Sequence, residues 1–359
     1  MSINQLNIHN FRNITTISTQ LEAHGANIIQ GKNGSGKTSF LEAIHFLGLG
    51  KSFKTRLIDR IISHKADTFS LFSTVLYEQQ KIAVGIEKGR KAHSRIRIAG
   101  KDVTTASELA EILPLQLLEP HSFLLLEGPP ELRRNFIDWG VFHVEHSFLN
   151  VWKNFSRCIK QRNSALRAHN SRDEVFSWNA ELIENGLKID AARKNYIHTF
   201  CETLKGILPE LLDIPSLEIH YYSGWTAEKS LSIALMDSIE RDLALGYTQF
   251  GPHHADLKIK VDRFPAKEVL SRGQQKLFIC AMKIAQGLLF QQVNKGKGCI
   301  YLLDDLVSEL DIANQGRVLD LLADQKSQLF ITCTDKQDVA QQIKTLPVKV
   351  LKMEQGYVI

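Results

Sequence analysis

Hydrophobic and polar positions along the chain follow two different periods. Near the N-terminus Leu6 and Ile8 alternate with polar neighbours, and residues 26–30 form a short apolar run, so both segments are predicted as strands. Apolar residues then recur at helical spacing over residues 40–47. From residue 70 to residue 100 the period returns to two, which predicts a small antiparallel sheet.

The middle of the chain is predicted to be helical. Pro129-Pro130 suits the start of a helix, and helical spacing continues to about Leu212. Two apolar stripes are predicted there, one of Ile183, Leu187 and Ala191 and one of Ile197, Cys201, Leu204 and Leu208. The last third alternates again, with buried strands predicted at 299–303 and 329–332 and helices between them.

This order of elements predicts an α/β fold. A mixed sheet with an antiparallel subdomain would be built from both ends of the chain, and a mostly helical lobe would be inserted between them. The predicted boundaries are 1–125 and 245–359 for the α/β head and 126–244 for the helical lobe.

Composition narrows the class only slightly. At 359 residues and 43% hydrophobic content, the chain can bury a substantial core, but a net charge of +5 is too small to name a nucleic-acid partner. The cysteines form no C-x-x-C pair, so core thiols in a reducing compartment are expected rather than a zinc site. No signal peptide and no apolar run of about 18 residues is found, so a cytoplasmic protein without a membrane span is expected.

Residues 31–38 match the phosphate-binding pattern G-x-x-x-x-G-K-[ST] in full, between a predicted strand and a predicted helix. Backbone N–H groups of such a loop surround phosphates, Lys37 would reach the β- and γ-phosphates of ATP during catalysis, and Thr38 would ligate Mg²⁺. The predicted nucleotide contacts are Gly31, Lys32, Asn33, Gly34, Ser35, Gly36, Lys37, Thr38 and Ser39. The alternative is a chance glycine-rich turn, which the flanking strand and helix disfavour.

The apolar run 299–303 ends in two carboxylates. A buried strand that delivers an acid to its carboxyl end is how a P-loop enzyme holds Mg²⁺, so Asp304 is predicted as a metal ligand. Asp305, which strand alternation would point the other way, is predicted to polarise the attacking water as a catalytic residue. The alternative is that both acids only end a strand and face solvent.

A third motif, Leu270-Ser271-Arg272-Gly273-Gln274-Gln275, opens a predicted helix upstream of the acidic strand. The order of P-loop, this segment, the double Asp and then Ser308-Glu309-Leu310-Asp311 resembles an ABC-type ATPase head. In that class the signature segment of one subunit caps the γ-phosphate bound to another. The resemblance implies a homodimer that forms on ATP binding, with further nucleotide contacts from Ser271, Arg272, Gly273, Gln274 and Asp311.

Further segments resemble the RecF family of bacterial DNA replication and repair proteins. They are Asn10-Phe11-Arg12-Asn13, Leu41-Glu42-Ala43-Ile44, residues 50–55, Gly128-Pro129-Pro130 with Arg133-Arg134 and Asp138-Trp139, and Phe250-Gly251-Pro252-His253. On this resemblance Arg12 joins the nucleotide contacts. The resemblance also implies slow, DNA-stimulated ATP hydrolysis, binding of double-stranded or gapped DNA, and partnership with RecR and RecO in recombinational gap repair.

Two departures from the family pattern stand out. After Gly251-Pro252 the chain reads His253-His254-Ala255-Asp256 where His-Arg-Asp-Asp is usual, which puts a DNA role of that loop in doubt. The switch histidine of many ABC ATPases would fall near Thr334, so slow turnover is expected. Gln116 is a candidate for the glutamine of the Q-loop, or equally a polar residue at the start of a strand.

Basic residues concentrate in two segments. Residues 51–101 hold twelve Lys and Arg against four Asp and Glu, a local net charge of +8, and residues 151–172 hold six Lys and Arg with no acid. Charge concentrated on a sheet suits a phosphate track. The predicted DNA contacts are Lys51, Lys54, Arg56, Arg95 and Arg97, with Lys153, Arg157 and Lys160 on one helical face of the second segment. The alternative for each is an ordinary solvated surface.

Three other classes fit the sequence less well. A transporter subunit would usually carry a compact helical insert and a switch histidine. An SMC-like structural protein needs sustained heptads between its motifs, which the sequence lacks. A nuclease paired to the ATPase needs a further cluster of acids, and none stands out after Asp311.

Overall fold

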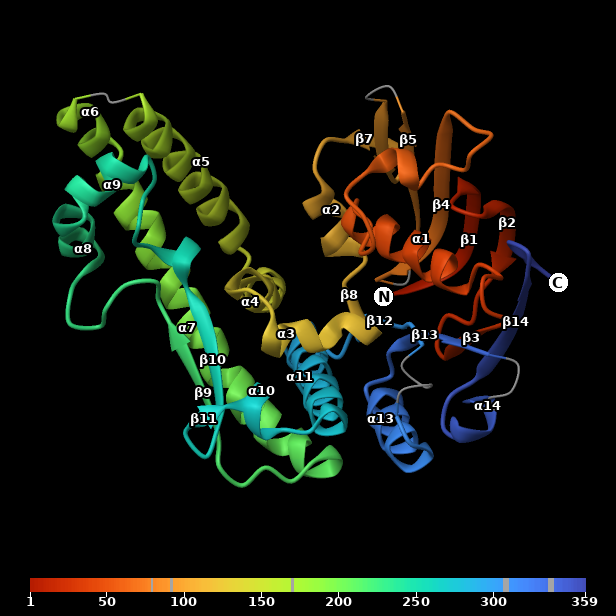
Figure 1. The fold of residues 1–359 in the computed structure, drawn as a ribbon. Coiled ribbons are helices and arrows are strands. Elements are labelled where there is room, and N and C mark those ends of the chain that lie inside the picture. Colours follow the sequence, from red (N-terminus) through yellow and green to blue (C-terminus); the bar gives the residue numbers. More distant parts are fainter. Residues whose placement is uncertain (79, 91–92, 169–170, 306–309, 335–338) are drawn as a thin grey trace. The chain divides into compact units, whose positions relative to one another are not determined.

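The computed structural model describes residues 1–359 except 79, 91–92, 169–170, 306–309 and 335–338. The chain divides into two compact units, Met1–Ser122 with Lys276–Ile359 and Phe123–Gln275 (Figure 1). The first unit is built from both ends of the chain. The division assigns residues 245–275 to the second unit, whereas the sequence analysis places them in the head. Strand pairing explains this, because β10 (Asp256–Val261) pairs with β9 (Leu217–Tyr222) of the middle segment.

An antiparallel sheet in the first unit has the strand order β2-β1-β4-β5-β6-β7. Its strands are β1 (Ser2–Phe11), β2 (Ile14–Gln20), β4 (Thr68–Tyr77), β5 (Gln80–Gly89), β6 (Ser94–Ile98) and β7 (Lys101–Val103). Alternation sets its faces in β1: Leu6 and Ile8 are buried, and the intervening residues Gln5, Asn7 and His9 are polar and at least partly exposed. The sheet predicted between residues 70 and 100 is therefore present.

A second, mixed sheet in the same unit has the order β15-β14-β3-β13-β12-β8. Its strands are β3 (Ala26–Gln30), β8 (Leu115–Leu118), β12 (Ile300–Leu303), β13 (Gln328–Cys333), β14 (Val348–Glu354) and β15 (Tyr357–Val358). All pairs are parallel except β14 with β15. Strands β3, β12 and β13 are nearly entirely buried, and most of their residues are apolar, as expected for strands covered on both faces.

Helices of this unit are α1 (Lys37–Leu49), α2 (Ala106–Ile112), α13 (Ile312–Asp324) and α14 (Val339–Gln342), with most of α11 (Arg272–Val293). Helix α1 contacts β1, β4 and β5 of one sheet and β8 and β13 of the other, so its apolar residues join a core shared by both sheets. Gly287 of α11 has no room for a side chain, because a Cβ atom there would lie 1.8 Å from the Tyr301 hydroxyl of β12.

The second unit is mostly helical with one small sheet. Its helices are α3 (Leu124–Glu127), α4 (Pro130–Val144), α5 (Phe148–Arg167), α6 (Arg172–Ser177), α7 (Asn179–Leu211), α8 (Leu231–Asp237), α9 (Ile239–Leu245) and α10 (Ala266–Val269). The sheet has the order β11-β10-β9, with β11 at Phe264–Pro265. Helix α4 begins at Pro130, as the Pro129-Pro130 pair predicts.

One predicted stripe on α7 is wrong. Leu187 is 46% exposed, and the buried face carries Asp190 and Arg193 among its apolar residues. Arg193 is held by Asp138 of α4 at 2.8 Å and by the carbonyl of Pro252 at 2.7 Å. These distant partners allow a charged residue to be buried, and sequence spacing does not report them.

The second basic segment is also partly buried. The guanidinium of Arg162 on α5 is fully inaccessible and bonds to Asp242 of α9 at 2.8 Å and to the Thr248 hydroxyl at 2.7 Å. Arg162 therefore cannot face DNA, whereas Lys153 and Lys160 are exposed on the same helix. Among the described helices, none is both long and apolar enough to span a membrane.

Candidate nucleotide-binding site

The loop between β3 and α1 forms an open cradle of backbone N–H groups. Gly34 and Gly36 have φ values of 79° and 110°, which other residues rarely adopt. Gly31 is required for a different reason, since a Cβ atom there would lie 2.3 Å from the carbonyl oxygen of Met353. The Ser35 hydroxyl is buried with no hydrogen-bond partner in the part of the chain that the structure describes. A buried hydroxyl without a partner at this point suits a phosphate ligand.

Lys37 is almost completely buried and is held by the loop itself. Its ammonium group donates hydrogen bonds to the carbonyl of Gly31 at 2.8 Å and to that of Lys32 at 3.1 Å. Both acceptors belong to the cradle. The charge therefore lies where phosphate oxygens would replace these carbonyls as acceptors.

Thr38 and Asp304 meet beside the cradle. The Thr38 hydroxyl donates a hydrogen bond to Asp304 Oδ1 at 3.1 Å, and the Thr332 hydroxyl donates to the same oxygen at 3.0 Å. Asp304 is only 5% exposed, and burial raises the pKa of its carboxyl group, against the effect of the Thr332 hydrogen bond. Two segments that are far apart in sequence thus bring a hydroxyl and a carboxylate into contact.

Asp305 is not placed by strand alternation. Strand β12 ends at Leu303, and Asp305 has a φ of 49°, so the backbone leaves the extended conformation. Its backbone N–H donates to the Thr332 hydroxyl at 2.8 Å. Thr332 is thus a residue that the sequence analysis missed, although it lies two positions before Thr334. Ser308 and Glu309 lie outside the described residues.

Arg12 forms an ion pair in the structure. Its guanidinium binds both oxygens of Glu42, at 2.9 and 2.6 Å, and donates to the carbonyl of Arg60 at 2.7 Å. Glu42 lies one helical turn beyond Thr38 on α1 and is 1% exposed; it also accepts a hydrogen bond from Ser52. Arg12 thus neutralises a buried carboxylate of α1, one helical turn after Thr38.

A cavity of about 660 Å³ opens beside the loop. Its lining residues are Gln30, Lys32, Asn33, Gly34, Ser35, Lys352, Met353, Glu354, Gln355 and Ile359. Its size falls in the range of small-molecule sites. Ser39 is linked to the loop through Asn13: the Ser39 hydroxyl donates to the Asn13 side chain at 2.8 Å, and Asn13 in turn donates to the carbonyl of Gly34 at 3.2 Å.

The signature segment forms the start of α11. The Ser271 hydroxyl accepts a hydrogen bond from the backbone N–H of Gln274, and the Gln274 side chain accepts one from the N–H of Ser271, a reciprocal capping box. Ser271 and Gly273 are exposed, and among the described residues nothing beyond the local backbone lies within 4 Å of where a Cβ atom on Gly273 would be. Arg272 pairs with Glu127 at 2.5 Å. The segment therefore presents a helix N-terminus that another molecule can approach closely.

Asp311 and Gln116 have local roles. Asp311 caps α13 by accepting a hydrogen bond from the backbone N–H of Asn314 at 2.9 Å, and this bond lowers the pKa of its carboxyl group. Gln116 is buried in β8, where it donates to Gln286 at 2.8 Å and accepts from Lys283 at 3.1 Å. This geometry favours the second alternative for Gln116, a polar residue within a strand.

Some basic side chains of residues 51–101 form hydrogen bonds within the first unit. Lys51, Lys54 and Arg56 are exposed in the loop after α1, and Arg95 and Arg97 are exposed on β6, where both pair with Asp102. Lys88 instead donates to the carbonyl of Gly50, and Arg90 donates to the carbonyl of Ala66. Lys91 lies outside the described residues. The five predicted DNA contacts remain available on the surface, since an exposed ion pair is weak.

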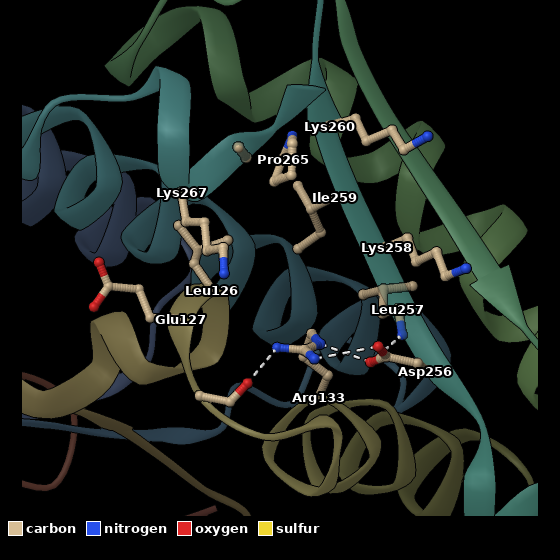
Figure 2. A pocket seen from close by; sticks show the side chains of 12 residues that line it. Leu126, Glu127, Arg133, Asp256, Leu257, Lys258, Ile259, Lys260, Pro265 and Lys267 are labelled. Carbon is tan, nitrogen blue, oxygen red and sulfur yellow. Dashed lines mark hydrogen bonds and ion pairs between the residues drawn. The ribbon is translucent and has the colours of Figure 1, made fainter. Parts of the chain in front are cut away.

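The second unit has its own cavity of about 240 Å³ beside β10, α3 and α10. Figure 2 shows the pair of Arg133 and Asp256 among its lining residues, joined at 2.7 Å. Arg133 also donates to the carbonyl of Gly128, and Arg134 donates to that of Ala255. The segment His253-His254-Ala255-Asp256, which departs from the family pattern, therefore still contains an acid, Asp256, that binds an arginine of α4.

The fold and site together define an ABC-type ATPase head, and the predicted fold class is confirmed. The family model described as "RecF/RecN/SMC N terminal domain" matches residues 2–358. DNA replication and repair protein RecF of Shewanella denitrificans is 40% identical over 358 residues, covering 100% of this chain and 99% of that protein. RecF of Stutzerimonas stutzeri is 43% identical over 362 residues, covering 100% and 97%.

Solved structures show the same fold. The recombination mediator protein RecF with ATP, from the RecFOR pathway, superposes with a TM-score of 0.88 at 23% identity, covering 100% of this chain and 97% of that one. An Smc head bound to the C-terminal winged-helix domain of ScpA gives a TM-score of 0.57 at 17% identity, covering 100% and 98%. The chain belongs to the RecF family of DNA replication and repair proteins.

Proposed function

We propose that this protein is an ATP-gated DNA-binding dimer: ATP closes two copies on DNA, and hydrolysis releases them. The observation that carries the proposal is the hydrogen bond from Thr38 to Asp304. It joins the end of the phosphate cradle to the carboxylate at the end of β12, which is the arrangement that a P-loop ATPase needs.

ATP would bind with its phosphates in the loop 31–38 and Lys37 between them. Thr38 and Asp304 supply hydroxyl and carboxylate oxygens, the ligands that Mg²⁺ prefers, so they would hold this ion. When bound, Mg²⁺ neutralises charge on the phosphates. Asp305 would orient the attacking water, because it follows Asp304 directly and its backbone is fixed by Thr332.

The signature segment would complete the site from a second copy. Ser271 and Gly273 are exposed at the N-terminus of α11, where backbone N–H groups favour an anion. ATP would then favour the dimer, because only the closed pair completes the coordination of the γ-phosphate. Slow hydrolysis is expected, since Thr334 stands where many ABC ATPases carry a switch histidine.

DNA would bind by its phosphates to the exposed basic residues of the first unit, which are Lys51, Lys54, Arg56, Arg95 and Arg97. Such contacts give affinity without reading sequence. The relatives that carry the RecF name, and the solved RecF structure that belongs to the RecFOR pathway, support DNA, RecR and RecO as partners. The DNA would be double-stranded or gapped.

The test follows the molecular mass of the Asp305→Asn variant by light scattering. Wild-type mass for one chain is 40.6 kDa. With Mg-ATP the variant should double in mass, because the metal carboxylate remains and hydrolysis is blocked, and the doubled species should retain duplex DNA. Lys37→Ala should stay monomeric, and Asp213→Asn, an exposed acid of the second unit, should behave as wild type. A monomer that binds ATP and ignores DNA would contradict the proposal.

A further inference from the structure

The small sheet of the second unit has an open edge. Strand β10 pairs with β9 along its whole length, Asp256–Val261, but with β11 only at Lys260 and Val261. The chain leaves the sheet after Pro265, where α10 begins. Among the described strands, none pairs with the rest of β10 on that side. The part of β10 before Lys260 therefore has a strand neighbour on one side only.

The turn between β10 and β11 shows which backbone groups face this open edge. Its two residues, Asp262-Arg263, have φ values of 50° and 70°, as in the tightest hairpins, so Val261 and Phe264 exchange hydrogen bonds across the turn. Bonding directions alternate along an antiparallel strand, so Ile259, two residues before Val261, faces the same edge. Leu257 also faces this edge, although its N–H is already bonded to the preceding carboxylate at 2.8 Å. The N–H and C=O of Ile259 therefore point to the side on which β10 lacks a strand neighbour.

The cavity of about 240 Å³ in this unit lies along the open edge. Figure 2 shows residues 256–260 of β10 on one side of it and residues of α3 facing them. The side chains of Leu257 and Ile259 are buried, whereas Lys258 and Lys260 point to the opposite face of the strand. A segment lying along the edge in extended conformation would direct alternate side chains to these two environments, one apolar and one basic.

The charged residues around the cavity leave an excess of positive charge. Both acids of the lining are neutralised within the unit, Asp256 by Arg133 at 2.7 Å and Glu127 by Arg272 at 2.5 Å. The other charged residues of the lining are three lysines: Lys258, Lys260 and Lys267. An acidic ligand therefore complements this edge of the sheet.

We propose that the open edge of β10 binds an acidic, extended segment of a partner protein as an added strand. Main-chain hydrogen bonds to Ile259 give affinity, and side chains of the segment give specificity. Its acidic residues lie across from Lys258 and Lys260, and its alternate, apolar residues lie on the side of Ile259. A nucleic-acid backbone would contact the lysines but leave the apolar side of the cavity unused, so a peptide fits better. The site goes beyond the proposed function, because it needs no nucleotide.

The experiment titrates a fluorescent peptide of about eight residues, alternating glutamate and valine, with the full-length protein and follows the anisotropy. The wild type should bind this peptide saturably without ATP, and should bind the matched peptide of alternating lysine and valine at least about tenfold more weakly. Amide hydrogen exchange, measured by NMR, should slow at Ile259 in the complex, because the added strand accepts its N–H. An ionic contact with the lysines alone would leave that exchange rate unchanged.

Two variants test the site from the side of the protein. Lys258→Gln combined with Lys260→Gln should lower affinity for the glutamate peptide about fivefold to tenfold, since two cross-strand charge pairs are lost. Lys205→Gln is the matched control, because this exposed lysine of α7 belongs to the same unit. Ile259→Pro removes the N–H that faces the open edge and should abolish binding. Should that variant fail to fold, the lysine variant and the exchange rate of Ile259 decide.

The inference would be overturned if the wild type failed to bind the glutamate peptide, if both peptides bound equally, or if exchange at Ile259 stayed unchanged. It would also be overturned if the variant with Lys258→Gln and Lys260→Gln lost affinity for duplex DNA but not for the peptide, which would assign these lysines to nucleic acid. None of these outcomes bears on whether ATP doubles the mass of the protein, so the proposed function is tested separately.

Discussion

The Thr38 hydroxyl donates a hydrogen bond to the Asp304 carboxylate at 3.1 Å, across 266 positions of sequence. The local chain around one residue does not position the other. Thr38 lies in the first turn of α1 because the glycine loop ends there, and Asp304 follows β12 because the apolar strand ends at Leu303. The parallel sheet brings both to one edge.

Replacing the hydroxyl of Thr38 should separate metal binding from nucleotide binding. Thr38→Val removes one of the two oxygens proposed to hold Mg²⁺ and nearly keeps the volume. ATP affinity in the presence of Mg²⁺ should fall at least about tenfold, and affinity in EDTA should be unchanged. Thr16→Val is the control, since Thr16 is an exposed threonine of β2. Equal losses with and without Mg²⁺ would show that Thr38 acts on the nucleotide alone.

Removing Arg12 should destabilise the protein even without nucleotide. Glu42 is 1% exposed, and Arg12 binds both of its carboxylate oxygens. Arg12→Met would leave a buried charge without its cation, which typically lowers the free energy of unfolding by about 3–5 kcal/mol. Urea unfolding without ATP measures the loss. Combining it with Glu42→Gln should restore part of the stability.

If Arg12 acts only as a nucleotide ligand, Arg12→Met should unfold at the same urea concentration as wild type. Arg60→Met is the control, because Arg60 contributes only its backbone carbonyl to this cluster and its side chain is exposed. A nucleotide role would appear separately, as lower ATP affinity in the Arg12→Met, Glu42→Gln double variant.

Freeing the arginines of β6 should strengthen DNA binding. Asp102 pairs with Arg95 at 2.9 Å and with Arg97 at 3.3 Å, and all three side chains are about half exposed. Asp102→Asn removes the competing acid, so DNA affinity should rise. Arg97→Ala should weaken binding and reduce the slope of log affinity against log salt by about one. Lys205→Ala on α7 should change neither quantity; DNA binding indifferent to salt would refute phosphate contact.

Much of the α/β head could be predicted from the sequence because each motif that identifies it lies within a short segment of the chain. The glycine spacing of residues 31–38, the apolar run before Asp304 and the Ser271–Gln274 segment each lie within one turn or strand. The fold class that these patterns predicted is confirmed. The assignment of ligands to them remains a prediction, as do the domain boundaries.

The residues that sequence analysis missed depend on partners far along the chain. Arg162 looked like a surface cation, but Asp242, 80 positions away, allows its burial. Thr332 reads as one more polar residue in a strand until parallel pairing brings it beside Asp304. No local period encodes such contacts.

Stability should depend on the titration of Lys283. Burial lowers the pKa of this lysine to about 8, from an ordinary value of 10.5 in the unfolded chain. Below pH 8 both states carry the proton, and the folded state bears the full penalty of the charge. Between pH 8 and 10.5 the unfolded state binds more protons than the folded state, so this lysine makes stability rise with pH over that window.

The Lys283→Met variant isolates this effect. The measured quantity is the free energy of unfolding of the wild type minus that of the variant. Between about pH 7.5 and 10.5 this difference should increase by at most about 3 kcal/mol. Contact of the side chain with water makes the increase smaller. Other groups that titrate in this range cancel in the difference. The lost hydrogen bond to Gln116 shifts all values by a constant, so the slope alone tests the burial.

Urea unfolding at a series of pH values measures the slope, and Lys81→Met, an exposed lysine of β5, supplies the control. A flat difference for Lys283→Met would mean that the ammonium is as well solvated in the folded protein as in the unfolded chain. The helix α11 would then hold no desolvated charge beside β8.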